Sequence, residues 1–488
     1  MFVFILTRRA YFVKIFYVRA KRYSSFKNKS YQLIEGTIYE EAFIMKEDIS
    51  IPNGSNSWLE RRFELTKNGT NPKTEILAGL TTFVTMAYIL FVNPITLEAA
   101  GMDKGAVFMA TALASALTTL LMGLYANYPF ALAPGMGLNA YFAYVMVGNV
   151  GLSWQAALGA VFISGIIGII VTLTGLRELL INAIPMPLKH AMGAGIGMFI
   201  AFIGLKNAGI IVASEATYLD LGNLAEPGPL LAVIGLVIMA ILTARRVKGG
   251  ILLGIIITTI IGIPMGITKF PSSIISLPPS LAPTLFKLNI REVMQISLFP
   301  VVFSLFFTDM FDSIGTFVGV ASRTGMIDKE GKLERGNKAL FVDFIGTVLG
   351  SLMGTSTITT YVESTAGVSE GGRTGLTAVV VAIMFAASII FSPIALAVPG
   401  EAVAPALILV GVFMSSSLNK INFNDFYEAF PAFLTIIMMP FSFSISFGLA
   451  IGFVAYVAVM LLGGRGKEVH WIMYALAVIF ILYFAVIR

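Results

Sequence analysis

The sequence has no cysteine, only two histidines and few charged residues. Without cysteine there is no disulfide, no thiolate metal site and no cysteine nucleophile. Two histidines leave little scope for a histidine-built metal site or a Ser-His-Asp triad. Only 12% of the 488 residues are charged, whereas 57% are hydrophobic. A soluble domain carries about 25% charged residues, so the composition predicts an integral membrane protein.

The basic excess of the chain lies entirely in its N-terminal tail. Residues 1–73 hold 13 Lys or Arg and 7 Asp or Glu, whereas the other 415 residues hold 20 of each. A basic tail on a membrane protein is typical of a cytoplasmic N-terminus, and it is no sign of nucleic-acid binding here. Residues 1–30 fit either an interfacial amphipathic helix or sequence ahead of a true start at Met45. We favour the start at Met45, which would leave residues 1–44 untranslated.

From Thr74 onward, apolar segments follow one another with short polar breaks. They form two sets of seven predicted membrane spans, in residues 74–267 and 298–463, joined by an extracellular connection at 268–297. The first set is 74–93, 105–125, 131–148, 154–175, 189–210, 228–243 and 249–267. The second is 298–321, 338–354, 356–370, 374–398, 402–417, 427–442 and 445–463. Residues 464–488 hold a last apolar run, 469–487, which is either a further span or a helix added along the bundle.

The third segment of each set is a poor lipid-facing helix. Phe130–Tyr144 reads FALAPGMGLNAYFAY, with Pro and two Gly inside it, and Gly354–Val368 reads GTSTITTYVESTAGV, with a Glu inside it. Interrupted segments at matching places in two halves indicate an inverted-repeat transporter with its substrate site at the midplane. An odd number of spans per set makes the two halves inverted. With the N-terminus inside, inner loops carry 14 Lys or Arg and outer loops five, as membrane proteins favour.

Three carboxylates are predicted to lie well inside spans, where charge costs at least ~2.5–3.5 kcal/mol. Asp309 and Asp312, in FFTDMFDSIGTFVGV, are three residues apart and share a helix face. Two close carboxylates in a low dielectric disfavour a double charge, so one could carry a coupling proton. Either could instead accept a structural hydrogen bond. Glu363, ahead of a predicted half-helix, could accept N–H bonds from a planar heterocycle, hold the coupling proton or cap the helix.

Two polar side chains accompany these acids in the interrupted segments. The amide of Asn139 donates and accepts, which suits the edge of a nucleobase, although a structural role in a broken helix would also explain it. Tyr361 could stack on a ring or hydrogen-bond to it, or face the core. No nucleotide-binding loop, nucleophile elbow or metalloprotease motif is present. The sequence therefore predicts no enzyme activity, no cofactor and no metal site.

The segments APGMGLNAYF, TDMFDSIGTFVGV and GTSTITTYVESTAGVSEGGRTGL resemble signatures of the nucleobase:cation symporter-2 family. The likeness runs from about Phe63 to the end and is greatest to the AzgA-like branch of adenine, guanine and hypoxanthine permeases. It implies an all-α fold of two inverted repeats of seven spans. In that fold the third and tenth spans start as short strands and continue as half-helices. Spans 1–4 and 8–11 would form a core domain, and spans 5–7 and 12–14 a gate domain.

The resemblance also implies a function. Glu363, Asp312 and Asn139 match the family's substrate-binding positions, and Asp309 is usual in this branch. It implies a multi-pass permease of the cell membrane that imports hypoxanthine, guanine or adenine. Many members are proton symporters and dimers, so a proton on Asp312, Glu363 or Asp309 and a homodimer are expected.

Two other functions fit the sequence less well. An anion carrier of the same inverted-repeat architecture, of the sulfate or bicarbonate type, would favour a cation at the midplane, where this sequence has carboxylates. A membrane-embedded enzyme would need a nucleophile and base, or metal ligands, at membrane depth, and the sequence offers neither.

Overall fold

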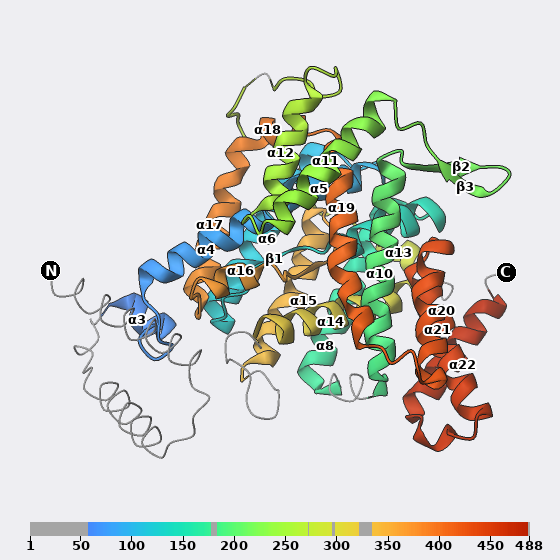
Figure 1. The fold of residues 1–488 in the computed structure, drawn as a ribbon. Helices are drawn as coiled ribbons and strands as arrows, with labels where there is room; N and C mark the ends of the chain where they lie inside the picture. The colour runs from blue at the N-terminus through green and yellow to red at the C-terminus, as the bar shows by residue number, and fades with distance from the viewer. Residues whose placement is uncertain (1–56, 177–182, 272, 295–297, 322–333, 487–488) are drawn as a thin grey trace, which may run out of the picture. The chain divides into compact units, whose positions relative to one another are not determined.

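The structure is a computed structural model that describes residues 57–176, 183–271, 273–294, 298–321 and 334–486. Its compact unit begins at Arg61 and is mostly helical (Figure 1). Eight of the described helices are long and apolar enough to cross a membrane, and three shorter ones are also apolar. The question of a start at Met45, or of an amphipathic helix in residues 1–30, lies outside the described residues.

The first repeat follows the predicted order of spans. Its elements are α4 (Pro72–Met86) with α5 (Ile89–Glu98), α6 (Lys104–Leu121) with the π-helix η1 (Met122–Ala126), β1 (Leu132–Pro134) with α7 (Met136–Ala140) and the π-helix η2 (Tyr141–Asn149), α8 (Trp154–Thr174), α10 (Met186–Asn207), α11 (Pro227–Ala244) and α12 (Gly250–Gly262). Helices α4, α6 and α8 start where the side chains of Asn71, Asp103 and Ser153 accept a backbone N–H.

The second repeat has the same order. Its elements are α14 (Phe299–Ala321), α15 (Gly336–Met353), β4 (Ile358–Thr360) with α16 (Ser364–Ser369), α17 (Gly375–Ser388) with α18 (Ser392–Ala397), α19 (Gly400–Met414), α20 (Phe426–Phe441) and α21 (Ile445–Leu462). The predicted architecture of two inverted sets, each with a strand and half-helix as its third member, is confirmed.

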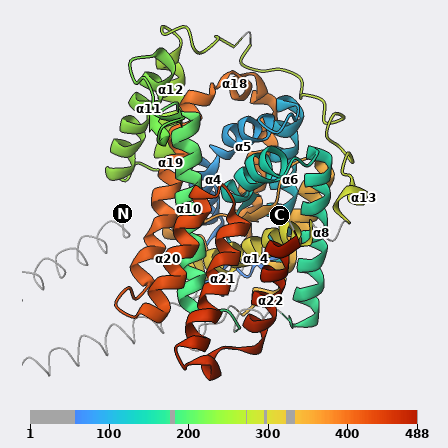
Figure 2. The same ribbon diagram turned by 90° about the vertical axis from the view of Figure 1, so that its right-hand side faces the viewer.

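Three features were not placed from the sequence. A hairpin, β2 (Ile211–Ser214) paired with β3 (Tyr218–Leu221), lies between α10 and α11. It is largely exposed and has no long apolar run, which is why the hydropathy pattern missed it. The connection 268–297 contains the short helix α13 (Ile290–Val293). The last apolar run forms α22 (Trp471–Val486), which packs against α21 (Figure 2).

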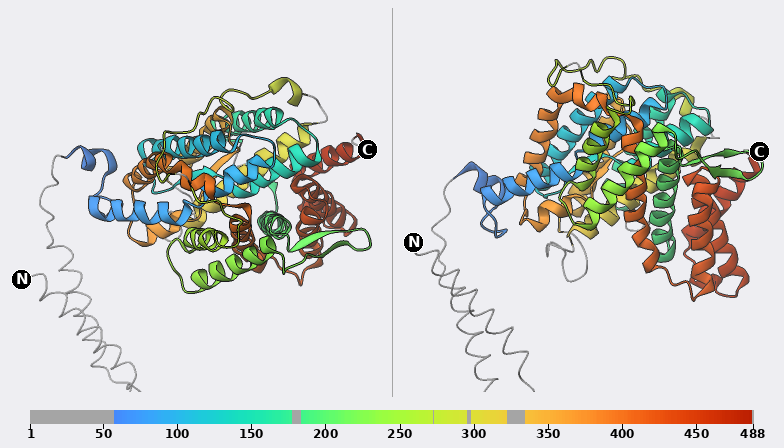
Figure 3. Two further views of the ribbon diagram at one scale, coloured as in Figure 1. Left: turned by 90° about the horizontal axis from the view of Figure 1, so that it is seen from above. Right: turned by 45° about the horizontal axis from the view of Figure 1, so that its top comes forward.

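The helices form two groups that pack mainly within themselves. The core group is α4 to α8 with α14 to α17 and the strands β1 and β4, and the gate group is α10 to α12 with α19 to α21. Figure 3 shows the gate helices along one side of the core helices. Contacts between the groups are few and involve chiefly α10 with α7, α14 with α21 and α4 with α12. The predicted division into core and gate is therefore present.

A buried carboxylate, Glu75 of α4, ties the two repeats together in the core group. It accepts the backbone N–H groups of Arg373, Thr374 and Thr377 at 2.8, 3.3 and 3.1 Å, and the Thr377 hydroxyl at 2.6 Å. These donors lie at the start of α17, where helix N–H groups have no partner within the helix. Glu75 therefore caps α17 from a different repeat.

Replacing Glu75 should destabilise the protein more than replacing an exposed acid. Glu75→Ala leaves several buried donors without an acceptor, so we expect the thermal unfolding midpoint in detergent to fall by about 3–6 °C. The control is Glu64→Ala, which removes only an exposed ion pair with Lys67 and should shift the midpoint by about 1 °C or less. Equal midpoints for the two variants would contradict the capping role.

Candidate functional site

The two interrupted segments meet at a short antiparallel strand pair in the middle of the core group. Ala133 of β1 is opposite Thr359 of β4, and both strands are fully buried. Backbone groups that strand pairing leaves free cannot stay unpaired inside a membrane. The Thr119 hydroxyl donates to the Leu132 carbonyl at 3.0 Å, and the Thr347 hydroxyl donates to that of Ile358 at 3.1 Å. Each strand is thus supported by the span that precedes it in its own repeat.

Each strand is followed at once by a half-helix. Gly135 precedes α7, and a Cβ there would lie 2.6 Å from the Thr359 side chain, so only glycine fits beside the opposite strand. Glu363 is the residue before α16. Helix N-termini carry partial positive charge. The strand pair therefore brings two such ends, one from each repeat, to the same region.

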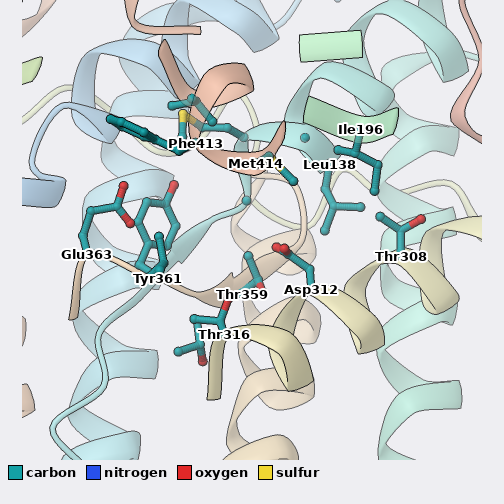
Figure 4. Close-up of a pocket in the computed structure, with 16 residues that line it drawn as sticks. Leu138, Ile196, Thr308, Asp312, Thr316, Thr359, Tyr361, Glu363, Phe413 and Met414 are labelled. Carbon is teal, nitrogen blue, oxygen red and sulfur yellow. The ribbon is translucent and has the colours of Figure 1, made fainter. Parts of the chain in front are cut away.

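A cavity of about 100 Å³ lies at this junction, between the core and gate groups (Figure 4). Among the described residues that line it, the polar side chains all come from the core group. They are Thr308, Asp312, Thr316, Thr359, Thr360, Tyr361 and Glu363, and the core group adds the apolar Met136, Leu138 and Val362. The gate group supplies Ile196, Val410, Phe413 and Met414. A ligand here would make its polar side-chain contacts to the core group and apolar contacts to both groups.

Three of the predicted site residues line this cavity, and Glu363 and Tyr361 come from the same stretch of chain. The Glu363 Oε1 atom accepts a hydrogen bond of 2.5 Å from the Tyr88 hydroxyl. The Tyr361 hydroxyl donates to the Pro134 carbonyl at 2.6 Å, so its ring lies at the cavity with the hydroxyl already engaged. Figure 4 shows this ring beside the Glu363 carboxylate. The arrangement leaves Tyr361 free to offer its ring to a ligand.

Asp312 is the third, and it projects from α14. Thr308 and Thr316, one turn before and after it, also line the cavity, so a polar stripe runs along this face of the helix. Asp312 is half-buried, and no residue in the described part of the chain donates a hydrogen bond to its carboxylate. Its acceptor capacity is therefore available to a ligand in the cavity.

Asn139 and Asp309 lie away from the cavity surface. Asn139 is fully buried, its Oδ1 accepts from the Ser356 hydroxyl, and its Nδ2 has no partner among the described residues. Asp309 is also fully buried, and its Oδ2 accepts from the Thr347 hydroxyl at 3.1 Å. Neither belongs to the cavity lining. Asn139 contacts Ser356, two residues before β4, and Asp309 contacts Thr347, whose hydroxyl also bonds to β4.

The expectation that only three carboxylates lie well inside spans is wrong. Asp343 of α15 is fully buried, and it accepts from the Ser313 hydroxyl at 2.6 Å and the Thr360 hydroxyl at 2.9 Å. Ser313 adjoins Asp312, and Thr360 adjoins Tyr361. Asp343 thus fixes two segments that carry cavity residues. The sequence could have indicated Asp343, because this acid lies within the predicted span 338–354. No motif and no neighbouring acid in the sequence distinguishes it, however.

The cavity combines two acceptor carboxylates with apolar and aromatic walls, and no Lys, Arg or His is among the described residues that line it. Such walls with a few fixed polar groups are typical of small-molecule sites. The acids favour a ligand that donates hydrogen bonds, and they disfavour an anion. In the described part of the chain, no three His, Cys, Asp or Glu residues are grouped to hold a metal ion.

Comparisons with known proteins agree with this architecture. Residues 73–485 match the Permease family. A protein of Methanocaldococcus jannaschii named as a permease, MJ0326, is 54% identical over 88% of this chain and 98% of its own length. The guanine/hypoxanthine permease PbuG of Bacillus subtilis is 47% identical over 87% and 99%, and the adenine permease AdeP of Escherichia coli is 46% identical over 87% and 95%.

Solved structures share the fold at low sequence identity. The transmembrane domain of the cyanobacterial bicarbonate transporter BicA matches 78% of this chain and 97% of its own, with a TM-score of 0.59 and 17% identity. The murine anion transporter Slc26a9 in an inward-facing state matches 86% and 75%, with a TM-score of 0.58 and 13% identity. With the family match, these findings show that the chain is a multi-pass membrane transporter of the nucleobase:cation symporter-2 family, not an enzyme.

Proposed function

We propose that the protein imports purine nucleobases, namely hypoxanthine, guanine or adenine, as a secondary active transporter of the cell membrane. The observation that carries this proposal is the pair of carboxylates, Asp312 and Glu363, on one cavity with no basic side chain in the described part of its lining. Curated relatives at 44–47% identity are named as permeases for these purines, which narrows the ligand from any hydrogen-bond donor to a purine base.

The chemistry of a purine fits the division of the cavity. A purine is flat and carries ring N–H groups at its edge, which Glu363 and Asp312 would accept. Its faces would lie against the Tyr361 ring and the apolar side chains Phe413 and Met414. Asn139 would act by holding the strand pair and, through it, the cavity wall.

The same division suits transport by movement of one helix group against the other. Alternating access in inverted-repeat transporters is largely a rigid-body motion around a fixed site. If polar contacts to substrate come from the core group alone, the core group can slide along the apolar gate surface with those contacts intact. The coupling proton would be carried by Asp312 or Glu363, with Asp309 as a further candidate. A cytoplasmic N-terminus and a homodimer complete the proposal.

The competing function is transport of an anion such as bicarbonate or sulfate. Two structural neighbours are anion transporters by name, but at 13–17% identity they support the fold alone. An anion placed between Asp312 and Glu363 would meet negative charge on two sides. The cavity offers helix N-termini, but no described residue of its lining has a cationic side chain to offset that charge.

Uptake measurements in a host without its own purine transporters test the proposal. We expect labelled hypoxanthine, guanine or adenine to accumulate, uracil, sulfate and bicarbonate not to accumulate, and a protonophore to abolish accumulation. Uptake of none of the three purines would overturn the assigned substrate class. Purine uptake that needs sodium and resists the protonophore would overturn only the coupling ion.

A further inference from the structure

Tyr88 is a buried tyrosine whose hydroxyl reaches the proposed substrate acid from another repeat. It lies between α4 and α5, in the first span, and its exposed fraction is 0%. Its hydroxyl donates to Glu363 Oε1 at 2.5 Å, across 275 residues of sequence. Tyr88 is not among the residues that line the cavity. Any influence on a ligand would therefore pass through Glu363.

The break in the first span sets the position of Tyr88. Pro94 lies inside α5 and has no N–H, so it cannot complete the hydrogen bond to the carbonyl of Leu90. At the junction, the Leu90 and Phe91 N–H groups bond to the carbonyls of Ala87 and Tyr88, three residues back, rather than four. This tighter turn interrupts the span at Tyr88, between α4 and α5.

The Tyr88 hydroxyl determines which oxygen of Glu363 is available. An ionised carboxylate only accepts, so the hydroxyl must be the donor in this pair. Oε1 is thereby occupied, and Oε2 is the oxygen that remains for a ligand in the cavity. A carboxylate without this partner could rotate about its terminal bond, because such torsions are broad.

We propose that Tyr88 is a positioning residue of the transport site. It holds Oε1 of Glu363 so that Oε2 faces the cavity and takes the N–H of the purine or the coupling proton. This role rests on the proposed function, in which Glu363 binds the substrate. A tyrosine that only filled space in the core would need its ring and not its hydroxyl.

Tyr88→Phe tests the role because it removes one oxygen and keeps the ring. In cells that express equal amounts of transporter, we expect KM for the preferred purine to rise about tenfold with Vmax within about twofold of wild type, because the acceptor oxygen of Glu363 is no longer held toward the cavity. The pH profile of KM should change as well, because Glu363 loses its partner. Kd for the labelled purine, measured on purified protein, should rise by the same factor.

Tyr128→Phe is the matched control. Tyr128 is equally buried in the core group, and its hydroxyl accepts the Arg335 N–H at 3.1 Å, away from the cavity. We expect wild-type KM, Kd and pH profile for this variant. Tyr88→His, which keeps a donor on a smaller ring, should give values between those of Tyr88→Phe and wild type.

The outcomes separate this inference from the function it rests on. Wild-type protein that takes up purine, together with Tyr88→Phe of unchanged KM, Kd and pH profile, would overturn the positioning role and leave the proposed function standing. A similar loss of affinity in Tyr128→Phe would also overturn it, since the loss would then follow from removing any buried hydroxyl and would not be specific to Tyr88. Wild-type protein that neither binds nor takes up a purine would overturn both.

Discussion

Glu363→Gln should abolish purine uptake, lowering its rate at least ~100-fold while the protein reaches the membrane in normal amount. The amide has one acceptor oxygen where the carboxylate has two. If that oxygen keeps the hydrogen bond from the Tyr88 hydroxyl, the amide –NH₂ faces the cavity. Donor would then meet donor where the purine N–H should bind, and the side chain could no longer carry a coupling proton.

The matched control for this variant is Glu370→Gln. Glu370 follows the same half-helix but lies outside the cavity lining, where it forms an ion pair with Lys248. We expect this variant to retain uptake. Asp312→Asn, on the opposite wall, should lose uptake as Glu363→Gln does. Wild-type rates in Glu363→Gln or Asp312→Asn, measured with equal protein in the membrane, would contradict the assigned acids.

Asp343→Ala should have the next largest effect. The substitution leaves the hydroxyls of Ser313 and Thr360 without their acceptor in a fully buried place and opens a void beside them. Together, these losses should lower the free energy of unfolding by about 2–5 kcal/mol. Because these hydroxyls hold α14 and β4 in register next to Asp312 and Tyr361, we expect uptake to fall at least ~10-fold and the thermal unfolding midpoint to fall with it.

Asp343→Asn and Asp103→Ala give the comparisons for that variant. Asparagine keeps the shape and one acceptor oxygen, and the hydroxyls can turn to accept from its amide. Uptake and the unfolding midpoint should therefore fall less in Asp343→Asn than in Asp343→Ala. Asp103 caps α6 at the surface of the core group through the Ala106 N–H, at 2.7 Å. Its replacement should cost about 1 kcal/mol and leave uptake intact. Uptake by Asp343→Ala equal to that of Asp103→Ala would show that Asp343 has no part in shaping the site.

The fold was predictable because two independent patterns agreed. Hydropathy divides the chain into two sets of seven spans, and the interruptions at Phe130–Tyr144 and Gly354–Val368 occupy the same place in each. The strand pairing of these segments depends on contacts between residues more than 220 apart, such as Ala133 with Thr359, and no local pattern encodes that register. The sequence therefore predicted which segments are broken but not how they meet.

The sequence predicted those residues of the candidate site whose acidic side chains are costly to place inside a membrane span. Asp312 shares a predicted span and a helix face with a second acid, Glu363 lies in a broken segment, and both line the cavity. Asp343 and Tyr88 carry no such mark, because a single acid or tyrosine in an apolar run becomes significant only when its partners are known. Asn139 shows the converse. Its place in a broken segment suggested ligand contact, whereas its side chain is buried against Ser356.

The central claim is that a purine base binds between Asp312 and Glu363. Equilibrium binding of labelled hypoxanthine, guanine and adenine to purified wild-type protein, Asp312→Asn, Glu363→Gln and Glu370→Gln tests it without the complication of transport. We predict saturable binding of at least one purine to wild type and Glu370→Gln, and its loss in both cavity variants. Unchanged purine binding in Asp312→Asn and Glu363→Gln would contradict the account.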